Sequence, residues 1–305
     1  MKSTNPNAIS LAIDPGPDLR PSGISKVSLS LTLLTACCNT RRTILRACRS
    51  VDAQRLLEGC SVEHLILDGA SRDGTLECLA EYESQRHSNG TASGVRRTVI
   101  SKPDRGLYDA VNDGLAKARG DLIGLLNADD FLAGDDVLSR ILDLFTRVAT
   151  DGVYGDLLYV KPRKGRLVQH RYWRSGDFGP SALRTGWTPP HPTLYLRRKV
   201  YEQVGNFRFD FGSAADYEFM VRLMRLPGLT LTYLPAVLVC METGGLSNCS
   251  VAARWRAHRA DRRAWKKNKL SPGFLSLPLK PLRKVPQFWR RHKSFVFPDW
   301  ANSAG

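Results

Sequence analysis

Two adjacent carboxylates follow a short apolar run near the middle of the chain. The run from Leu122 to Leu126 predicts a buried strand, which places Asn127, Asp129 and Asp130 at its carboxyl end. Ligands of open α/β sheets collect outside that end, and oxygen donors of this kind suit Mg²⁺ or Mn²⁺. The pattern therefore indicates a divalent-metal site, with a capped turn that starts a helix as the alternative.

A second acidic turn lies earlier in the chain, where Asp68 and Gly69 open the segment DGASRDGT. Asp68 is suited to accept hydrogen bonds from a base N–H or a ribose hydroxyl, and Gly69 allows a close approach of the backbone. Asp73 is expected to cap the following helix. Because the turn contains no G-x-G-x-x-G, a dinucleotide-binding enzyme is disfavoured.

The elements that position these residues can be read from the apolar spacing. Val62 to Leu67 predicts a strand that enters the DGASRDGT turn, and a helical pattern follows it. A second helical pattern, from Leu107 to Ala118, precedes the run that ends at Leu126. Strand, acidic turn and helix in this order predict a nucleotide-binding βα crossover of an α/β protein.

Two further polar residues have both a chemical and a structural interpretation. Asp216 stands in ADYEF, at the start of a predicted helix, where an acid can serve as a base or simply favour the helix dipole. His191 opens an apolar strand in TPPHPTLYL, where it could contact a diphosphate or satisfy a loop carbonyl. Gly244 and Gly245 could close over a ligand, but such pairs also form ordinary turns.

Together, the motifs resemble the family 2 glycosyltransferases of the GT-A fold, in the branch that extends polysaccharides or glycolipids. The resemblance spans roughly Ser28 to Ser250 and rests on DGASRDGT, PDRGLYDAVNDG, NADD, HPT, ADYEF and GGLS in the family's order. It implies an α/β GT-A fold, meaning a Rossmann-like, nucleotide-binding mixed sheet flanked by helices, with a basic C-terminal extension.

The resemblance also implies roles for individual residues. Asp216 matches the catalytic base of an inverting, hexosyltransferase-type enzyme, and Asp129 and Asp130 match the acids that bind Mg²⁺ or Mn²⁺. Donor-binding residues, which would hold a UDP-linked or GDP/TDP-linked sugar, are Thr35, Asn39, Asp68, Asp104, Asn127 and His191. The implied acceptor is a lipid-linked saccharide.

The positive charge of the chain is concentrated at its C-terminal end. Residues 251–305 contain 14 Lys or Arg and two acids, a net charge of +12 out of the formal +16. Aromatic residues such as Trp265 and Trp289 interleave with them, which predicts association with an anionic membrane surface. The alternatives are a nucleic-acid-binding arm and a solvated helix. Because the tail has no RNA-binding motif, we expect it not to bind nucleic acid.

These observations divide the chain into a flexible leader (1–26), a glycosyltransferase domain (27–250) and a membrane-associating tail (251–305). Seven cysteines without metal spacing, no secretion signal and no long apolar span predict a cytoplasmic protein, peripheral on the inner face of the cell membrane. Two alternatives stay open: a nucleotidyltransferase, although Thr35 to Arg42 is a poor phosphate loop, and a non-catalytic basic binding protein on the same fold.

Overall fold

The computed structural model describes residues 28–88, 94–177, 182, 187–243, 259, 262–269, 286–289, 292 and 295–301. The predicted leader (1–26) and the GGLS motif at Gly244 lie outside these ranges.

Within the described residues, a nine-stranded mixed sheet has the order β3-β2-β1-β4-β8-β6-β9-β5, and β7 pairs with β6. Its strands are β1 (Ser30–Cys37), β2 (Ser61–Asp68), β3 (Val95–Ser101), β4 (Leu122–Leu125), β5 (Asp130–Leu132), β6 (Gly152–Arg163), β7 (Arg166–Trp173), β8 (Tyr195–Arg197) and β9 (Leu231–Glu242).

The first half of the sheet is parallel, because strands β3, β2, β1 and β4 all run in the same direction. The strands β2, β1 and β4 are mostly buried, as expected for parallel strands covered on both faces, whereas the edge strand β3 is mostly exposed. In β1, Leu31 and Leu33 join one core cluster while Leu34 and Ala36 join another, because successive side chains point to opposite faces. The strand predicted from Val62 to Leu67 is confirmed as β2.

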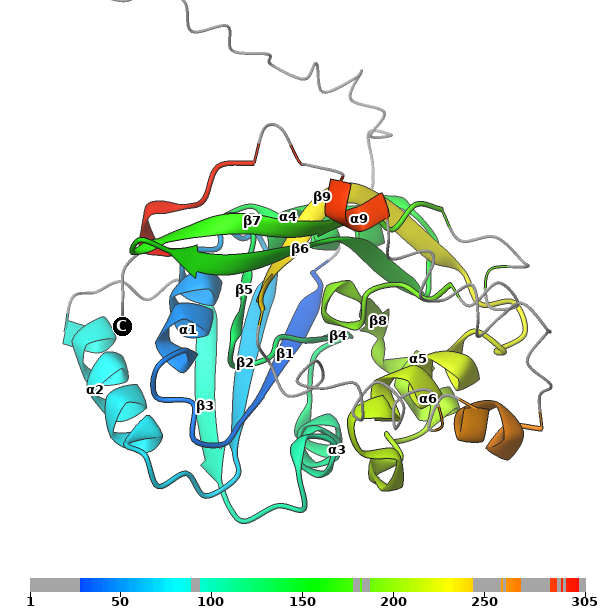
Figure 1. Cartoon of the computed structure of the whole chain (residues 1–305), viewed down its shortest axis with the longest axis horizontal. Coiled ribbons are helices and arrows are strands. Elements are labelled where there is room, and N and C mark those ends of the chain that lie inside the picture. The colour runs from blue at the N-terminus through cyan, green and yellow to red at the C-terminus, as the bar shows by residue number, and fades with distance from the viewer. Residues whose placement is uncertain are drawn as a thin grey trace, which may run out of the picture.

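Helices cover both faces of this sheet. On one face pack α1 (Ile44–Asp52), α2 (Thr75–Ser88) and α4 (Val137–Arg147); on the other pack α3 (Leu107–Lys117), α5 (Arg198–Val204) and α6 (Ala215–Leu223). Figure 1 shows α3, α5 and α6 gathered together, away from α1 and α2. The helix predicted from Leu107 to Ala118 is confirmed as α3, and Asp216 lies in the first turn of α6 as predicted.

The second half of the sheet is antiparallel except for the pairing of β6 with β9. Only residues 126–129 separate β4 from β5, yet β8, β6 and β9 lie between these two strands in the sheet. In a flat sheet β5 would lie four strand spacings, about 19 Å, from β4, whereas five extended steps reach at most about 18 Å. The sheet therefore curls, which brings β5 and its neighbour β9 near the end of β4. The curl places the turn that contains Asp129 against the last strand.

Described parts of the C-terminal segment also pack on this body. Short helices follow β9, namely α9 (Pro286–Trp289) and η5 (Asp299–Ala301), and residues 262–267 are helical as well. Trp265 is only 2% exposed and contacts α6, so its predicted place at a membrane surface is wrong: the indole fills a gap between protein elements instead. Trp289, in contrast, is 81% exposed. Among the described residues, none of the helices has the length and apolar character needed to span a membrane.

Candidate active site

The carboxyl ends of the parallel strands bring the first predicted site residues together. The strand register places Cys37 beside Asp68 and Asp68 beside Ser101. Asp68 is almost completely buried, and its Oδ2 accepts hydrogen bonds from the Ser101 hydroxyl (2.7 Å) and the Ser71 N–H (3.0 Å). The Ser71 hydroxyl donates to the other oxygen, Oδ1. Asp68 therefore stabilises the DGASRDGT turn through these buried hydrogen bonds.

Gly69 brings this turn into close contact with the loop that precedes α3. A Cβ atom at residue 69 would lie 2.5 Å from Oδ2 of Asp104, so the carboxylate of Asp104 occupies the space that any larger residue would need. Oδ1 of Asp104 accepts the Gly106 N–H at 2.8 Å. The pKa of exposed Cys38 is raised by partial burial and then by the charges of Asp104 and Asp68, so the edge carries a concentrated negative charge.

The loop after β1 is linked to the same turn by Asn39. Its backbone has a positive φ of 54°, its N–H donates to the Ser71 hydroxyl oxygen (2.8 Å), and its side-chain oxygen accepts the Arg72 N–H (2.9 Å). Thr35 is not brought to the site: it is fully buried, and its hydroxyl is bonded to His64 at 2.9 Å. Asn39 thus lies at the edge and Thr35 within the core.

The two adjacent acids lie where the chain passes from β4 to β5. Asp129 is half-buried, and burial raises the pKa of its carboxyl, with a further increase from Glu242. Asp130 is fully buried; Asn127 donates to its Oδ2 at 2.8 Å, while Oδ1 has no hydrogen-bond partner. Burial, followed by the charge of Asp129, raises the pKa of Asp130 well above its usual range. The alternative in which Asp-Asp starts a helix is wrong, because Asp130 begins β5.

One residue near these acids could not be found from the sequence. Arg46, on α1, donates to the backbone oxygen of Asp129 at 3.2 Å and forms an ion pair with Glu242 at the end of β9. Its guanidinium opposes the rise in the pKa of both Asp129 and Asp130. Because it lies 83 residues before Asp129, no local spacing marks it.

Asp216 and His191 lie together on the α3, α5 and α6 side of the sheet. Burial lowers the pKa of His191 and the carboxylate of Asp216 opposes this shift, which places the imidazole within electrostatic reach of that carboxylate. Tyr108, on α3, also lies within electrostatic reach of Asp216. Burial, followed by the charge of Asp216, raises the pKa of the Tyr108 phenol. Phe207 joins the group, with ring centroids 5.2 Å from Tyr108 and 5.6 Å from His191.

The architecture is the GT-A fold, which solved structures share. One is S. aureus TarS 1-349 in complex with UDP-GlcNAc, at a TM-score of 0.58 and 15% identity over 88% of this chain and 74% of that chain. Another is the mannosyltransferase PcManGT from Pyrobaculum calidifontis with GDP-Man and Mn²⁺, at a TM-score of 0.57 and 17% identity over 89% and 75%.

Sequence comparison narrows this class to a family. The profile of glycosyl transferase family 2 matches residues 32–207, more than half of the chain. The chain therefore belongs to glycosyl transferase family 2 and is a glycosyltransferase. It is 29% identical, over 62% of its length and 69% of the relative, to a PGL/p-HBAD biosynthesis glycosyltransferase of Mycobacterium bovis. It is also 26% identical, over 63% of its length and 14% of the relative, to the O-antigen biosynthesis protein RfbC of Myxococcus xanthus.

Proposed function

We propose that this enzyme transfers a sugar, with inversion and with help from a divalent metal, from a nucleotide-sugar donor to a hydroxyl of a lipid-linked saccharide. The observation that carries the proposal is the placement of Asp104 and Asp129 at the carboxyl edge of one sheet, with Asp216 on a helix of the same domain. A nucleotide bound across this edge would extend from the Gly69 turn toward Asp129. Family membership leaves the nucleotidyltransferase and the non-catalytic alternatives without support.

The turn from Asn127 to Asp130 fits a divalent cation. Two neighbouring acids have raised pKa values, so their ionised forms are unfavourable without a cation, and Oδ1 of Asp130 is buried without a hydrogen-bond partner. Asp129, which is partly exposed, would hold Mg²⁺ or Mn²⁺, with Asp130 adding charge beneath it. Such ions are commonly held by one or two carboxylates plus substrate phosphates. When bound, the ion would stabilise the departing diphosphate.

A shortage of protein ligands agrees with this arrangement. The part of the chain that the structure describes contains no group of three or more His, Cys, Asp or Glu side chains arranged to hold a metal. A site with so few protein ligands binds its ion weakly until the diphosphate contributes oxygens. We therefore expect metal and donor to bind cooperatively.

Asp216 is the proposed general base. It lies near the positive end of α6, accepts the N–H of Tyr217 at 2.6 Å, and remains partly exposed. In this role, it would take the proton from the acceptor hydroxyl while the hydroxyl oxygen bonds to the anomeric carbon and the bond from that carbon to the diphosphate breaks. Because the pKa of His191 is lowered, the neutral imidazole is favoured at pH 7 and does not form an ion pair with Asp216. The Asp216 carboxylate therefore stays available to accept a proton.

The solved structures support a class of donor, the nucleotide sugars. TarS was crystallised with UDP-GlcNAc and PcManGT with GDP-Man, so this fold accommodates both uracil and guanine nucleotides. We propose a UDP-linked or GDP/TDP-linked sugar. The relatives named for PGL/p-HBAD and O-antigen biosynthesis support an acceptor in glycolipid or polysaccharide synthesis.

An exposed face supports approach to a lipid-linked acceptor. Trp289 and Phe288 of α9 are 81% and 51% exposed, and the Phe288 ring lies against Arg171 of β7 at 5.4 Å. The hairpin between β6 and β7 adds Arg163, Lys164 and Arg166, which line a shallow hollow. In Figure 1, α9 lies over β6 and β7. Exposed aromatics beside basic residues suit an anionic membrane surface on the cytoplasmic side.

A nucleotide-sugar screen tests the proposed function. The full chain would be mixed with UDP-, GDP- and TDP-linked sugars, each with Mn²⁺ or with EDTA, and both the thermal unfolding midpoint and the release of nucleoside diphosphate would be measured. We expect one nucleotide class to raise the midpoint and to be hydrolysed only when the metal is present. Equal stabilisation in EDTA would show that donor binding does not need the metal. The absence of a response to any donor would contradict the proposed function.

A further inference from the structure

The segment 262–269 packs along α6, the helix whose first turn carries Asp216. Trp265 is 2% exposed and Ala264 is fully buried; both join a cluster with Phe211, Ala215 and Val221. The indole N–H of Trp265 donates to the Tyr217 hydroxyl at 3.0 Å. A segment with a net positive charge is thus fixed to the domain by apolar burial and a buried hydrogen bond.

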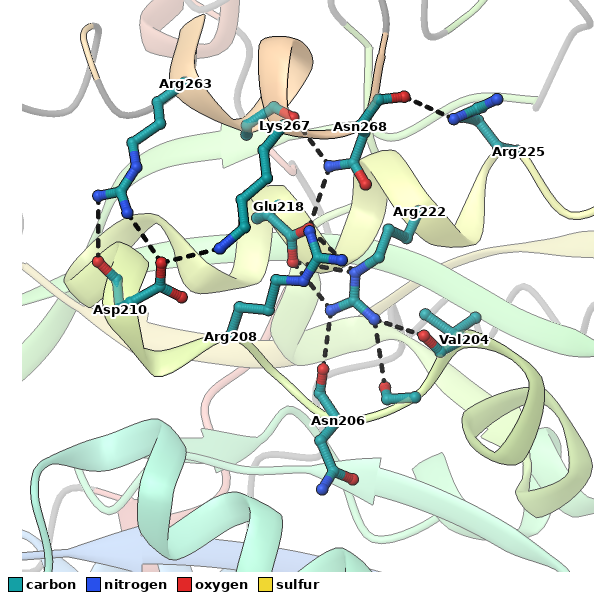
Figure 2. Close-up of polar contacts among 12 residues, drawn as sticks. Val204, Asn206, Arg208, Asp210, Glu218, Arg222, Arg225, Arg263, Lys267 and Asn268 are labelled. Atoms are coloured by element: carbon teal, nitrogen blue, oxygen red, sulfur yellow. Dashed lines mark hydrogen bonds and ion pairs between the residues drawn. The ribbon is translucent and has the colours of Figure 1, made fainter.

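A buried carboxylate, Glu218, is the centre of this contact (Figure 2). It is fully buried, and Arg222 pairs with it through Nε (3.0 Å) and Nη2 (2.8 Å). Arg208 donates to the same carboxylate at 2.9 Å, and the Asn268 amide donates to it at 3.0 Å. A buried charge is tolerated only when its oxygens are fully paired, so Asn268 supplies a bond that the arginines alone do not.

The same segment contacts residues that lie before, within and after α6. Before it, Arg263 and Lys267 donate to Oδ2 of Asp210 at 2.8 and 3.1 Å. Within it are the contacts to Tyr217 and Glu218. After it, Arg225 donates to the backbone oxygen of Asn268 at 2.7 Å. Figure 2 shows the Asp210 contacts to one side of Glu218 and the Arg225 contact to the other.

The contacts to Glu218 lie on the side of α6 that faces away from Asp216. Residues two apart on an α-helix are separated by about 200° around its axis, so Glu218 points away from the direction of Asp216. Arg222 continues the network to the backbone oxygens of Asn206 (2.8 Å) and Gly205 (3.4 Å), which directly precede Phe207. The network therefore holds both α6 and the loop that places Phe207 against His191.

We propose that the segment 262–269 is a positioning element, in which Trp265 and Asn268 fix α6 from behind and thereby set the place of Asp216 relative to the donor. The inference rests on the proposed role of Asp216 as the base. It assigns part of the basic C-terminal region to the reaction itself, separately from any contact with a membrane. A base displaced by a fraction of an ångström loses much of its effect, so these residues influence turnover without touching substrate.

The test uses full-length Trp265→Phe and Asn268→Ala, with Lys266→Ala as the matched control, because Lys266 is exposed on the same segment. Turnover is the metal-dependent hydrolysis of whichever of UDP-glucose, UDP-GlcNAc and GDP-mannose the wild type cleaves. We expect kcat to fall about tenfold in both variants, with the KM for donor within about twofold of wild type. Hydrogen exchange at the amides of residues 215–219 should accelerate in the two variants and not in the control.

A double-mutant cycle separates positioning from general destabilisation. In an Asp216→Asn background, Asn268→Ala should cause little further loss of kcat, because the group that it positions is already disabled. An equal further loss, or an unchanged kcat in the single variants despite faster amide exchange, would overturn the proposal. Wild-type turnover in Asp216→Asn alone would instead overturn the base assignment, and this inference with it.

Discussion

At the scale of single residues, the uncompensated charge of Asp129 and Asp130 links stability to function. Burial raises both pKa values, the charge of Asp129 adds to the shift of Asp130, and the charge of Glu242 adds to both shifts. Arg46 opposes both shifts but is itself paired with Glu242. The ionised pair therefore costs folding free energy in the absence of a cation. A site that is unfavourable when empty is a common property of ligand-binding positions.

This cost predicts that Asp130→Asn stabilises the metal-free protein. An acid whose pKa is raised by folding binds more protons folded than unfolded, so wild-type stability falls as the pH rises from about 4 toward the raised pKa. The variant has no such carboxyl, so its stability should exceed that of wild type by about 1 to 3 kcal/mol at pH 7, with the difference shrinking toward pH 4. Urea unfolding at several pH values measures this. A variant less stable than wild type at pH 7 would show that the charge is compensated.

Asp129→Ala tests the cation more directly. Removing this acid should abolish the Mn²⁺-dependent gain in donor affinity and leave the fold intact, because Asp129 is the partly exposed member of the pair. Isothermal titration with and without Mn²⁺ gives the comparison. If Mn²⁺ strengthened donor binding to the variant as much as to wild type, the cation would have to bind elsewhere.

Asp216→Asn should separate binding from chemistry. The amide keeps the size of the side chain and loses its basicity, so donor affinity should be unchanged while turnover falls by a factor on the order of 10² to 10⁴. Steady-state kinetics together with donor titration measure both quantities. Near-wild-type turnover would return Asp216 to the role of an acid that favours the start of α6.

At the scale of elements, the sequence predicted the local structure well where apolar spacing was regular. The helix from Leu107 and the strand from Val62 were found because their side chains face a core, and periodicity records that burial. Thr35 was misplaced in the expected donor site because its burial depends on His64 of the neighbouring strand. The curl of the sheet, which brings Glu242 near Asp129, depends on contacts far apart in the chain and has no local signal.

The close contact between the Gly69 turn and the loop before α3 leads to an element-scale prediction. Gly69→Ala would place a methyl group 2.5 Å from the present position of Asp104 Oδ2, which forces that carboxylate to move. Donor affinity should weaken about tenfold, equivalent to roughly 1.4 kcal/mol, with little change in the unfolding midpoint. Gly94→Ala is the matched control, since its Cβ would meet only Leu56 at an ordinary 3.4 Å. Equal donor affinity in the two variants would exclude a role for this contact.

At the scale of the whole molecule, the basic C-terminal region divides into two parts. Residues 262–269 pack on α6, whereas α9 presents Phe288 and Trp289 to solvent. Composition alone assigned both parts to a membrane surface, because the burial of Trp265 depends on Tyr217, 48 residues earlier in the chain. Charge counts predict a surface but not which aromatic residues remain on it.

The exposed part gives a prediction about vesicles. Phe288→Ser with Trp289→Ser should reduce co-sedimentation with anionic vesicles at low salt, because the aromatic insertion that supplements the attraction of about 1 kcal/mol per basic residue is lost. Val99→Ser, which alters an exposed apolar residue on the β3 edge strand, is the control. Equal pelleting of the double variant and wild type would contradict a membrane role for α9.

The stereochemistry of donor cleavage shows whether the reaction is a single in-line displacement assisted by Asp216, and it can be measured without knowledge of the acceptor. The full chain would hydrolyse an α-linked nucleotide sugar with Mn²⁺, and proton NMR would record the anomer of the released sugar before it equilibrates. Because water would attack opposite the leaving diphosphate, we expect the β-anomer first. Initial release of the α-anomer would contradict this mechanism.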